Sequence, residues 1–463
     1  METLPDEVLL EVFDHYRLSS GNDWSHPRGW YRLVHVCQRW RLTVLASSLR
    51  LHLRLRCTFK KQVEDMITYS PPFPLILNYN PSDGKTWTTQ DEDGALFALQ
   101  HLERAHEITL IAPETILTKL VVAMTCMAPL LEYLELKSEA AELVLPENFL
   151  DGGAPRTRHL RLAGVALRTL RPLPSFSTTL VNLSLERIPG PAYFSPENLV
   201  QHIRPMPQLR TLCIGFLSTT PRPPPLPPHP IPRVELPALA RFEYRGVSAW
   251  SETFLAKVRT PRLNYIHTTL FNQLTLSMWH ISQFFHSVET LRPNRARIKF
   301  SEKYVDVTMT AQPHPYQLAD AILRVPCARF DFQVAAVAQI CSALHAILLS
   351  VEALTLTFHG RELPKEWQNE VNTALWRDLL EPFPHVKTLA AGAALGTELG
   401  RTLAQSEEGD GPVAELLPEL LTIALRWEDQ RVFAAASAAL GPFIDVRGRS
   451  SRPVKVKPLW GLT

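Results

Sequence analysis

One short strand pattern recurs along this chain and limits what it can fold into. Apolar and polar residues alternate over a few positions, and the central apolar residue returns after 26 residues from Ile108 to Leu134 and after 26 more at Leu160. Such alternation predicts half-buried strands, and the stretches between them have the apolar spacing of helices. Strands and helices in alternation predict an α/β fold with a parallel sheet. The later central residues are Leu183, Leu212, Phe242, Ile266, Leu354 and Leu389.

The spacing of these strands distinguishes two α/β architectures. From Leu160 to Ile266 the intervals are 23, 29, 30 and 24 residues, and leucine-rich repeats have periods of about 20–29 residues with an LxxLxL strand. An ordinary α/β domain built of strand–helix units also alternates in this way. We favour an irregular leucine-rich-repeat-like solenoid with helices on its outer side, because the LxxLxL strand itself recurs at that period. A length of 463 residues also exceeds one compact core.

Capping residues and apolar spacing locate the helices and the exceptions to the repeat. Ser195, followed by a proline and a glutamate, is a favourable helix start, and Pro146-Glu147-Asn148 is similar. Arg297–Phe300 and Tyr304–Met309 alternate with period two around a polar turn and predict an inserted hairpin. Further helices are predicted at Glu114–Met127, Met278–His286, Ala335–Leu349, Trp367–Leu380 and Arg431–Leu440, and a last strand at Pro453–Lys457.

The composition argues against several classes of protein. Hydrophobic residues make up 45% of the chain and charged residues 20%, which is ordinary for folded proteins. The net charge is only +2, whereas nucleic-acid-binding domains are strongly basic, so we expect no nucleic-acid partner. The acidic start METLPDEVLL is not a signal peptide, and polar residues interrupt the most apolar stretch, Ala335–Leu356. We therefore expect an intracellular protein without a membrane span, in the cytoplasm, the nucleus or both.

No motif for catalysis or metal binding is complete. Gly84-Lys85-Thr86 lacks the first glycine of a phosphate-binding loop, because Tyr79 stands there. His101 and His106 have no third ligand nearby, and no GxSxG occurs. We expect no enzyme activity, no cofactor and no metal, and we expect the cysteines, which lack CxxC spacing, to be buried, reduced thiols. The six are Cys37, Cys57, Cys126, Cys213, Cys327 and Cys341.

The first 57 residues predict two amphipathic helices with more apolar surface than they can bury. Thr3 can cap the first helix, and Leu9 and Phe13, four residues apart, share one of its faces. Two short helices alone form a marginal core. The surplus apolar surface fits either the groove of a partner or the end of the repeats, which the helices would then cap. The apolar stripe of the second helix consists of Leu33, Val36, Cys37, Trp40, Val44 and Leu45.

Residues 4–57 resemble the F-box. The resemblance lies in LPDE at the start of the first helix, VCxxWR in the second half and the leucines of Leu49–Leu55, whereas Gly21–Trp30 departs from the usual leucine-rich middle. The rest of the chain is weakly similar to F-box proteins common in mushroom-forming fungi. The adaptor-binding residues that the resemblance implies are Leu4, Pro5, Leu9, Phe13, Val36 and Trp40.

The resemblance implies a subunit of a Skp–cullin–F-box ubiquitin ligase. The F-box would bind the Skp-type adaptor, and through it a cullin, while the repeats would bind a protein substrate. We accordingly predict an F-box-like segment at residues 1–60, a connecting or capping region at 61–106 and the solenoid at 107–463. The alternative is a repeat-protein scaffold without a link to ubiquitin, whose N-terminal helices form the cap.

The polar residues of the predicted strands define a candidate substrate surface. In an LxxLxL strand the leucines point into the core, and the residues between them point to the concave side of the sheet. This row is mixed in charge and contains Tyr and Arg, which are enriched in tight interfaces. A solvated sheet face without a partner shows the same alternation. The candidate substrate-binding residues are Tyr133, Glu135, Arg161, Glu186, Arg241, Arg245 and Tyr265.

Two further segments each allow two interpretations. The segment 218–237 is rich in proline and should be extended, and Arg222–Pro228 within it fits the motif that SH3-type domains bind. The basic tail Arg447–Lys457 fits a nuclear-import or acid-binding patch. We favour a rigid connector for the first, and for the second a capping strand with Val454 and Val456 facing inward.

Overall fold

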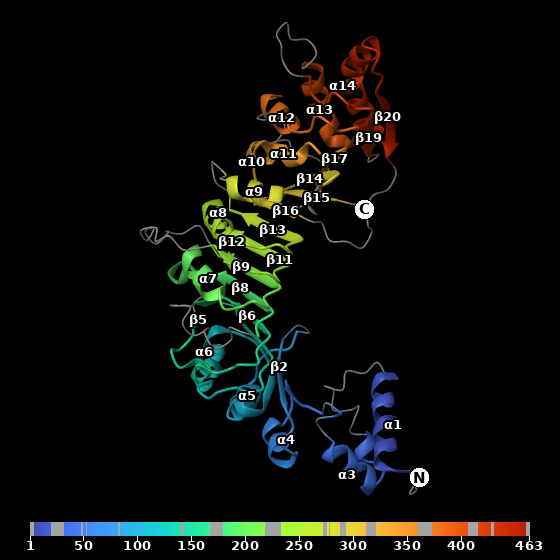
Figure 1. Cartoon of the computed structure of the whole chain (residues 1–463). Coiled ribbons are helices and arrows are strands. Elements are labelled where there is room, and N and C mark those ends of the chain that lie inside the picture. Colours follow the sequence, from blue (N-terminus) through green and yellow to red (C-terminus); the bar gives the residue numbers. More distant parts are fainter. Residues whose placement is uncertain are drawn as a thin grey trace. The chain divides into compact units, whose positions relative to one another are not determined.

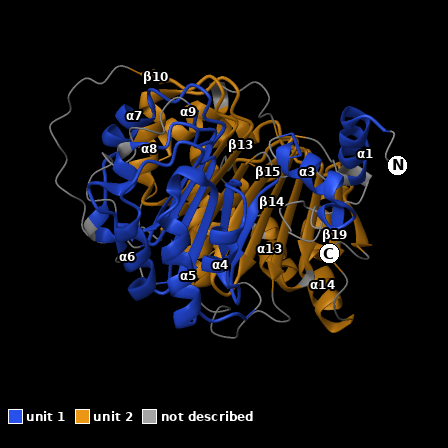
Figure 2. Cartoon of the chain, turned by 90° about the horizontal axis from the view of Figure 1, so that it is seen from below, with its two compact units in different colours: residues 1–225 blue, residues 226–463 orange. Residues whose placement is uncertain are grey.

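The computed structural model contains two compact units, residues 1–225 and 226–463 (Figure 2). Most of the proline-rich segment, at 218–232, lies outside the described residues, as does Gly21–Trp30 of the F-box-like region. The structure describes residues 4–19, 32–47, 50–51, 53–81, 84–139, 143–166, 179–217, 233–271, 276, 278–287, 293–311, 321–359, 373–405, 415–426 and 430–459.

Unit 1 consists of two N-terminal helices followed by a parallel sheet with helices along one face (Figure 1). Every neighbouring pair of its strands is parallel. The strands, in sheet order, are β1 (Leu55–Thr58), β2 (Leu75–Tyr79), β3 (Ala105–Ala112), β4 (Tyr133–Ser138), β6 (His159–Ala163), β8 (Asn182–Ile188) and β9 (Thr211–Phe216). The helices are α1 (Asp6–Ser19), α3 (Gln38–Ala46), α4 (Val63–Tyr69), α5 (Thr89–Leu99), α6 (Glu114–Ala123) and α7 (Pro196–Ile203). A short parallel pair, β5 (Leu143–Val144) and β7 (Val165–Ala166), lies outside this sheet.

The apolar residues at the centre of the sequence pattern are paired with one another across neighbouring strands of this sheet. Ile108 pairs with Leu134, Leu134 with Leu160, and that residue with Leu183. All four side chains are at most 2% exposed. The row continues to Leu212 on β9. The α/β class with a parallel-dominated sheet is therefore confirmed, and its cause is the burial of one apolar row per strand.

The sheet of unit 1 starts earlier than the sequence predicted. Residues 61–106, predicted as a connecting or capping region, contain α4, β2, α5 and the first two residues of β3, Ala105 and His106. The strand before them, β1, uses residues assigned to the F-box-like segment, since Leu55 pairs with Leu75 of β2. The strand pattern of the sequence begins at 107 because β1 and β2 are short, and their apolar residues do not complete an LxxLxL pattern.

Unit 2 contains a mostly parallel sheet with an antiparallel insertion. The predicted hairpin exists and consists of β14 and β15. It lies inside the sheet, because the next strand, β16, pairs with both β15 and β13. Strand β15 is antiparallel to both of its neighbours, β14 and β16. The strands, in sheet order, are β11 (Arg241–Gly246), β13 (Tyr265–Leu270), β16 (Ala321–Pro326), β15 (Tyr304–Thr310), β14 (Arg295–Ser301), β17 (Ala353–His359), β18 (Thr388–Gly392), β19 (Thr422–Arg426) and β20 (Lys455–Leu459). A separate parallel pair joins β10 (Val234–Glu235) and β12 (Val258–Arg259).

The tail forms the predicted capping strand. Strand β20 pairs in parallel with β19, Val454 before it is buried, and Lys455 and Lys457 are exposed. Arg447 is the exception in this basic tail, because it belongs to helix α14 and is buried.

The helices of unit 2 match most of the predicted ones. Each predicted helix corresponds to an observed helix, with ends that differ by several residues. One prediction in unit 1 was wrong: after Asn148 only a 3₁₀ turn forms, at Phe149–Gly152, because Leu150 and Asp151 adopt left-handed φ angles of 52° and 44°. The helices are α8 (Ser248–Lys257), α9 (Trp279–Ser287), α10 (Phe330–Ala343), α11 (His345–Leu348), α12 (Thr373–Leu380), α13 (Ala393–Gln405) and α14 (Gln430–Arg449).

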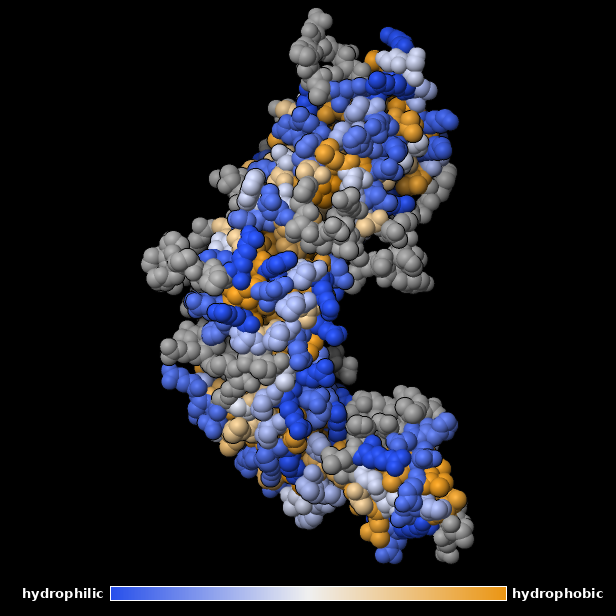
Figure 3. Space-filling view, in the orientation of Figure 1, coloured by the Kyte–Doolittle hydropathy of each residue, from blue (hydrophilic) through white to orange (hydrophobic). Residues whose placement is uncertain are grey.

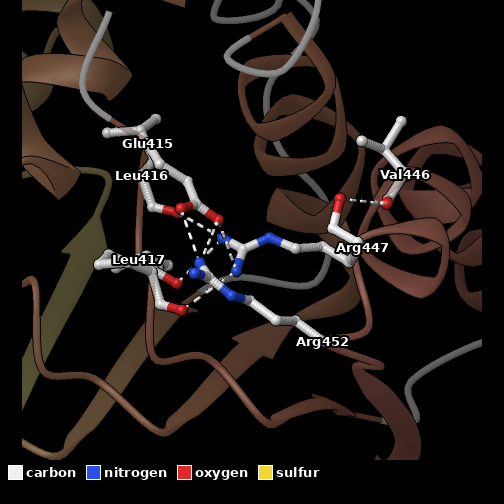
Figure 4. A network of polar contacts seen from close by, with 8 residues as sticks. Glu415, Leu416, Leu417, Val446, Arg447 and Arg452 are labelled. Atoms are coloured by element: carbon white, nitrogen blue, oxygen red, sulfur yellow. Dashed lines mark hydrogen bonds and ion pairs between the residues drawn. The ribbon is translucent and has the colours of Figure 1, made fainter.

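A buried arginine fixes the loop that leads into β19 (Figure 4). Arg447, only 1% exposed, donates hydrogen bonds to the carbonyl oxygens of Leu416, Leu417 and Pro418 at 2.9–3.1 Å. Its guanidinium also pairs with Glu415 at 2.9 Å. The side chain thereby satisfies carbonyl groups of the loop, of which the Leu417 carbonyl also accepts a hydrogen bond from the Leu420 amide at 3.0 Å.

We expect Arg447→Leu to lower the free energy of unfolding by about 3–5 kcal/mol, because it removes the donor from buried carbonyls and one of the two cations that pair with Glu415. The matched control is Arg452→Leu, since Arg452 pairs with the same Glu415 at 3.0 Å but its side chain is 57% exposed. That change should cost less than about 1 kcal/mol. Urea unfolding followed by circular dichroism compares the two, and equal losses would contradict a special role for the buried arginine.

Candidate interaction surfaces

The N-terminal helices α1 and α3 form a small core of their own. Phe13 of α1 and Trp40 of α3 meet edge to face with ring centroids 4.8 Å apart. Leu9 is 1% exposed and Phe13 is fully buried. Asp6, at the start of α1, accepts hydrogen bonds from Arg39 of α3 at 2.7 and 3.1 Å. Aromatic packing and an ion pair thus hold the two helices together, and we call them the helical pair.

The helical pair also carries apolar side chains that face solvent. Val8 and Val12, one turn apart on α1, are 40% and 49% exposed, and Leu4 just before the helix is 39% exposed. Val36, before α3, and Leu42, on α3, are 54% and 60% exposed. Figure 3 shows hydrophobic residues at the surface over these two helices. We call these five residues the exposed apolar face.

The six predicted adaptor-binding residues divide into three groups by their exposure. Leu4, Pro5 and Val36 are exposed, as a contact with a partner requires. Leu9 and Phe13 are not, because they fill the core between α1 and α3, and the prediction that they face a partner is corrected on this point. Trp40 is half-buried against Phe13. The sequence signal for Val8 and Val12 was present in their four-residue spacing from Leu4.

In unit 1 the predicted substrate residues lie side by side on the polar face of the sheet. Tyr133 of β4 pairs in register with His159 of β6, and Glu135 pairs with Arg161. The next strand places Ser184 opposite Arg161, with Glu186 two residues further on β8. Each of these side chains is half-buried or exposed, whereas the leucines that alternate with them along the strands are buried. The alternation predicted from the sequence is confirmed here.

Ion pairs and hydrogen bonds connect this row. Arg161 reaches Glu186 at 3.1 Å and Glu135 at 3.6 Å. Burial opposes the charge of Arg161, but the two carboxylates outweigh it and raise its pKa. Burial and a 2.8 Å hydrogen bond donated to Glu135 raise the pKa of Tyr133 to about 12. The tyrosine therefore stays protonated and its hydroxyl group is committed to Glu135.

The row extends toward the start of the sheet through residues that sequence analysis did not select. Arg54, just before β1, pairs with Glu107 of β3, and its guanidinium lies 3.1 Å from His106 Nε2. The His106 ring, whose Nδ1 lies 3.5 Å from the Glu107 carboxylate, lowers the pKa of Glu107, with a further contribution from Arg54. His106 also lies 3.4 Å from Glu132. These side chains come from segments about 50 residues apart in sequence, so local patterns could not join them.

In unit 2 the predicted residues form a second polar cluster. Arg241 of β11 donates a 2.6 Å hydrogen bond to Glu243 and lies over the ring of Tyr265 of β13, 4.1 Å from its centroid. Arg245 is exposed. Beyond them, Arg324 of β16 forms a two-point pair with Asp306 of β15 at 2.6 and 2.8 Å. Most charges here are already satisfied within the sheet.

The described residues contain neither a metal-binding group nor a membrane-spanning helix. No three of their His, Cys, Asp or Glu side chains are grouped to hold a metal ion. None of the helices they form is long and apolar enough to cross a bilayer. His101 has an ion-pair distance of 3.6 Å to Glu103, and His106 belongs to the polar row.

The cysteines are free thiols, and only half of them are buried as predicted. Cys57, Cys327 and Cys341 are buried, and burial raises the pKa of Cys57 to about 12. Cys37 and Cys126 are exposed, which corrects the prediction for them, and the thiol of Cys37 instead caps α3 by accepting from the Trp40 amide at 3.5 Å.

Comparisons with known proteins add little to this picture. A scan against protein-family models finds no match, and a search of curated proteins finds none either. Among solved structures, the chain is similar to the leucine-rich repeat-containing protein LegL7 from Legionella pneumophila, with 10% sequence identity and a TM-score of 0.26 over 84% of this chain and 97% of that one. This likeness is too weak to carry an argument, so the assignments rest on the geometry above.

We expect the two faces of β6 to respond differently to substitution. Leu160→Ala should lower the free energy of unfolding by about 2–5 kcal/mol because Leu160 is buried. Arg161→Gln should cost about 1 kcal/mol or less because Arg161 is a partly exposed ion-pair partner. Glutamine is preferred to glutamate, which would add a third carboxylate beside Glu135 and Glu186. Urea unfolding measures both, and similar losses would show that the polar face supports the fold.

Proposed function

We propose that this chain is a substrate-recruiting subunit of a Skp–cullin–F-box ubiquitin ligase. The helical pair binds the Skp-type adaptor, and the repeats bind a protein substrate. Ubiquitin transfer belongs to other subunits, so this chain supplies no catalytic group, and it acts in the cytoplasm, the nucleus or both. The observation that supports the proposal most is the exposed apolar face, together with the resemblance of residues 4–57 to the F-box.

The exposed apolar face favours a partner over a cap. Helices that only capped the repeats would bury their apolar side chains against the sheet. Instead Leu9 and Phe13 fill the core between the helices, while Val8, Val12 and Leu42 remain 40–60% exposed. Grouped exposed apolar side chains on a small helical segment are typical of a protein-binding surface. The buried pair then holds α1 and α3 in place for that surface.

The polar rows support the second half of the proposal. In unit 1, Tyr133, Arg161 and Glu186 offer an aromatic ring, a cation and an anion on adjacent strands. In unit 2, Arg241, Arg245 and Tyr265 offer a similar mixture. Such residues on a rigid sheet suit a specific contact with a folded or extended partner, because little side-chain entropy is lost on binding.

We expect Val8→Asp combined with Val12→Asp to remove co-purification with a Skp-type adaptor, because two carboxylates would be buried without partners in the interface. The measurement is recovery of the adaptor from a co-expression with the full-length chain. Val122→Asp is the matched control, since Val122 is an exposed valine of α6 with 58% exposure and lies outside the helical pair. That variant should retain the adaptor.

Unchanged adaptor recovery from a soluble Val8/Val12 double variant would refute the adaptor role. The chain would then act as a repeat scaffold without a link to ubiquitin. Substitution of Trp40 is not informative here, because its ring packs on Phe13 and its loss would disturb the helical pair itself.

We also expect Arg161→Gln and Arg245→Gln, made separately, each to change the set of proteins captured by the adaptor-bound chain. Both residues lie on the polar faces and neither belongs to the helical pair, so adaptor recovery should stay constant. Quantitative mass spectrometry of the captured proteins tests this. If the captured sets are identical for the wild type and both variants, these positions do not contact the substrate.

A further inference from the structure

On the polar face of unit 2, the size and charge of the side chains change toward the C-terminus. Across β14, β17, β18, β19 and β20, one row of side chains runs in register through Arg297, Thr355, Ala390, Ala424 and Lys457. The strand neighbours of these residues, such as Ile298, Leu356 and Ile423, are buried on the opposite face. The middle of the row is small, and both ends are long cations.

The same arrangement is repeated in the adjacent row. Arg295 of β14 pairs with Ala353, and the row continues through Thr388 and Thr422 to Lys455 of β20. Lys299 adds a third cation on β14. The result is a floor of threonine and alanine on three strands between two cationic walls. With about 4.8 Å between strands, the strands that carry the walls are about 19 Å apart.

The side chains of the five cations of the walls form no hydrogen bond or ion pair with the described residues: Arg295, Arg297, Lys299, Lys455 and Lys457. The nearby acids have other partners. Asp306, opposite Lys299 in the sheet, forms its two-point pair with Arg324. Glu352 binds Lys387 at 2.8 Å. Among the described residues the walls therefore carry positive charge without a paired acid, whereas Arg161 and Arg54 of unit 1 are paired with glutamates.

We propose that this floor together with its two walls, which we call the cationic floor, binds an acidic, extended segment of a partner protein. Aspartate and glutamate carboxylates match the lysine and arginine side chains of the walls. An extended segment can lie over a floor without bulky side chains and present alternate residues to opposite sides. The inference rests on the proposed function, because it names the chemical class of its substrate, but the surface lies in unit 2 and does not involve the helical pair.

An acidic protein segment fits this surface better than a nucleic acid does. Proteins that bind single-stranded nucleic acids without sequence preference place aromatic side chains under the bases. The floor has threonine and alanine at those positions, with Thr355, Ala390 and Ala424 in its central row. The whole chain also has a net charge of only +2, against the strongly basic domains of nucleic-acid binders.

The probe for the test is a labelled peptide of alternating glutamate and serine, about ten residues long, which exceeds the roughly 17 Å length of a five-residue strand. Fluorescence anisotropy with the full-length chain measures its Kd. We expect Arg297→Gln combined with Lys457→Gln to weaken binding about tenfold, which corresponds to about 0.7 kcal/mol for each lost exposed charge pair. Raising the ionic strength should weaken binding to the wild type.

The matched control is Arg401→Gln combined with Arg452→Gln, which removes the same charge from unit 2. Both side chains are exposed, at 60% and 57%, and each already pairs with a glutamate. The control should keep the wild-type Kd within about twofold, since long-range charge effects are screened. Equal weakening in both double variants, or no binding by the wild type at low ionic strength, would overturn the proposal.

Two further measurements separate the remaining outcomes. Tighter binding of a labelled oligouridylate than of the peptide would show that the floor is a nucleic-acid surface and would overturn the proposal. Adaptor recovery with the Arg297/Lys457 variant should equal that of the wild type. Conversely, the Val8/Val12 variant should lose adaptor binding and keep peptide binding. A failure of the peptide test alone contradicts the cationic floor, and a failure of the adaptor test alone contradicts the ligase role.

Discussion

Both units depend on one constraint, which is the burial of an apolar row on every strand. Ile108, Leu134 and Leu160 can leave water only if adjacent strands stack in register and helices cover the same face. A single strand with its helix cannot bury that face alone, so each element is stabilised mainly by its neighbours. Side chains alternate along a strand, and the same requirement therefore places every second residue on the opposite, polar face.

That polar face differs along the chain because charge pairing differs. In unit 1, Arg161 lies between Glu135 and Glu186, and Arg54 pairs with Glu107, so these two cations have acids within the sheet. At the C-terminal end of unit 2, Arg297 and Lys457 have no described partner. Paired charges contribute shape and hydrogen-bonding groups to an interface, whereas unpaired ones attract a partner of opposite charge. One fold can thus present two kinds of surface.

In the helical pair, unlike in the sheets, the apolar residues of one helix serve two purposes. Leu9 and Phe13 are packed inside, where with Trp40 they set the angle between α1 and α3. Val8 and Val12, one position earlier on the same helix, remain exposed. A rotation of 100° per residue along a helix is enough to separate a residue that holds the segment together from one that is available to a partner.

The sequence alone determined the α/β class, the strands centred on the repeated apolar residues and the polar face that contains Arg161 and Arg245, because alternation along a strand is a local property. It also predicted the hairpin of β14 and β15 and the capping strand β20. Tertiary structure alone decided that β16 lies between β13 and β15, that Arg54 meets His106, and that Arg297 and Lys457 border one floor. Those contacts join residues that are distant in sequence, and only the stacking of strands in register brings them together.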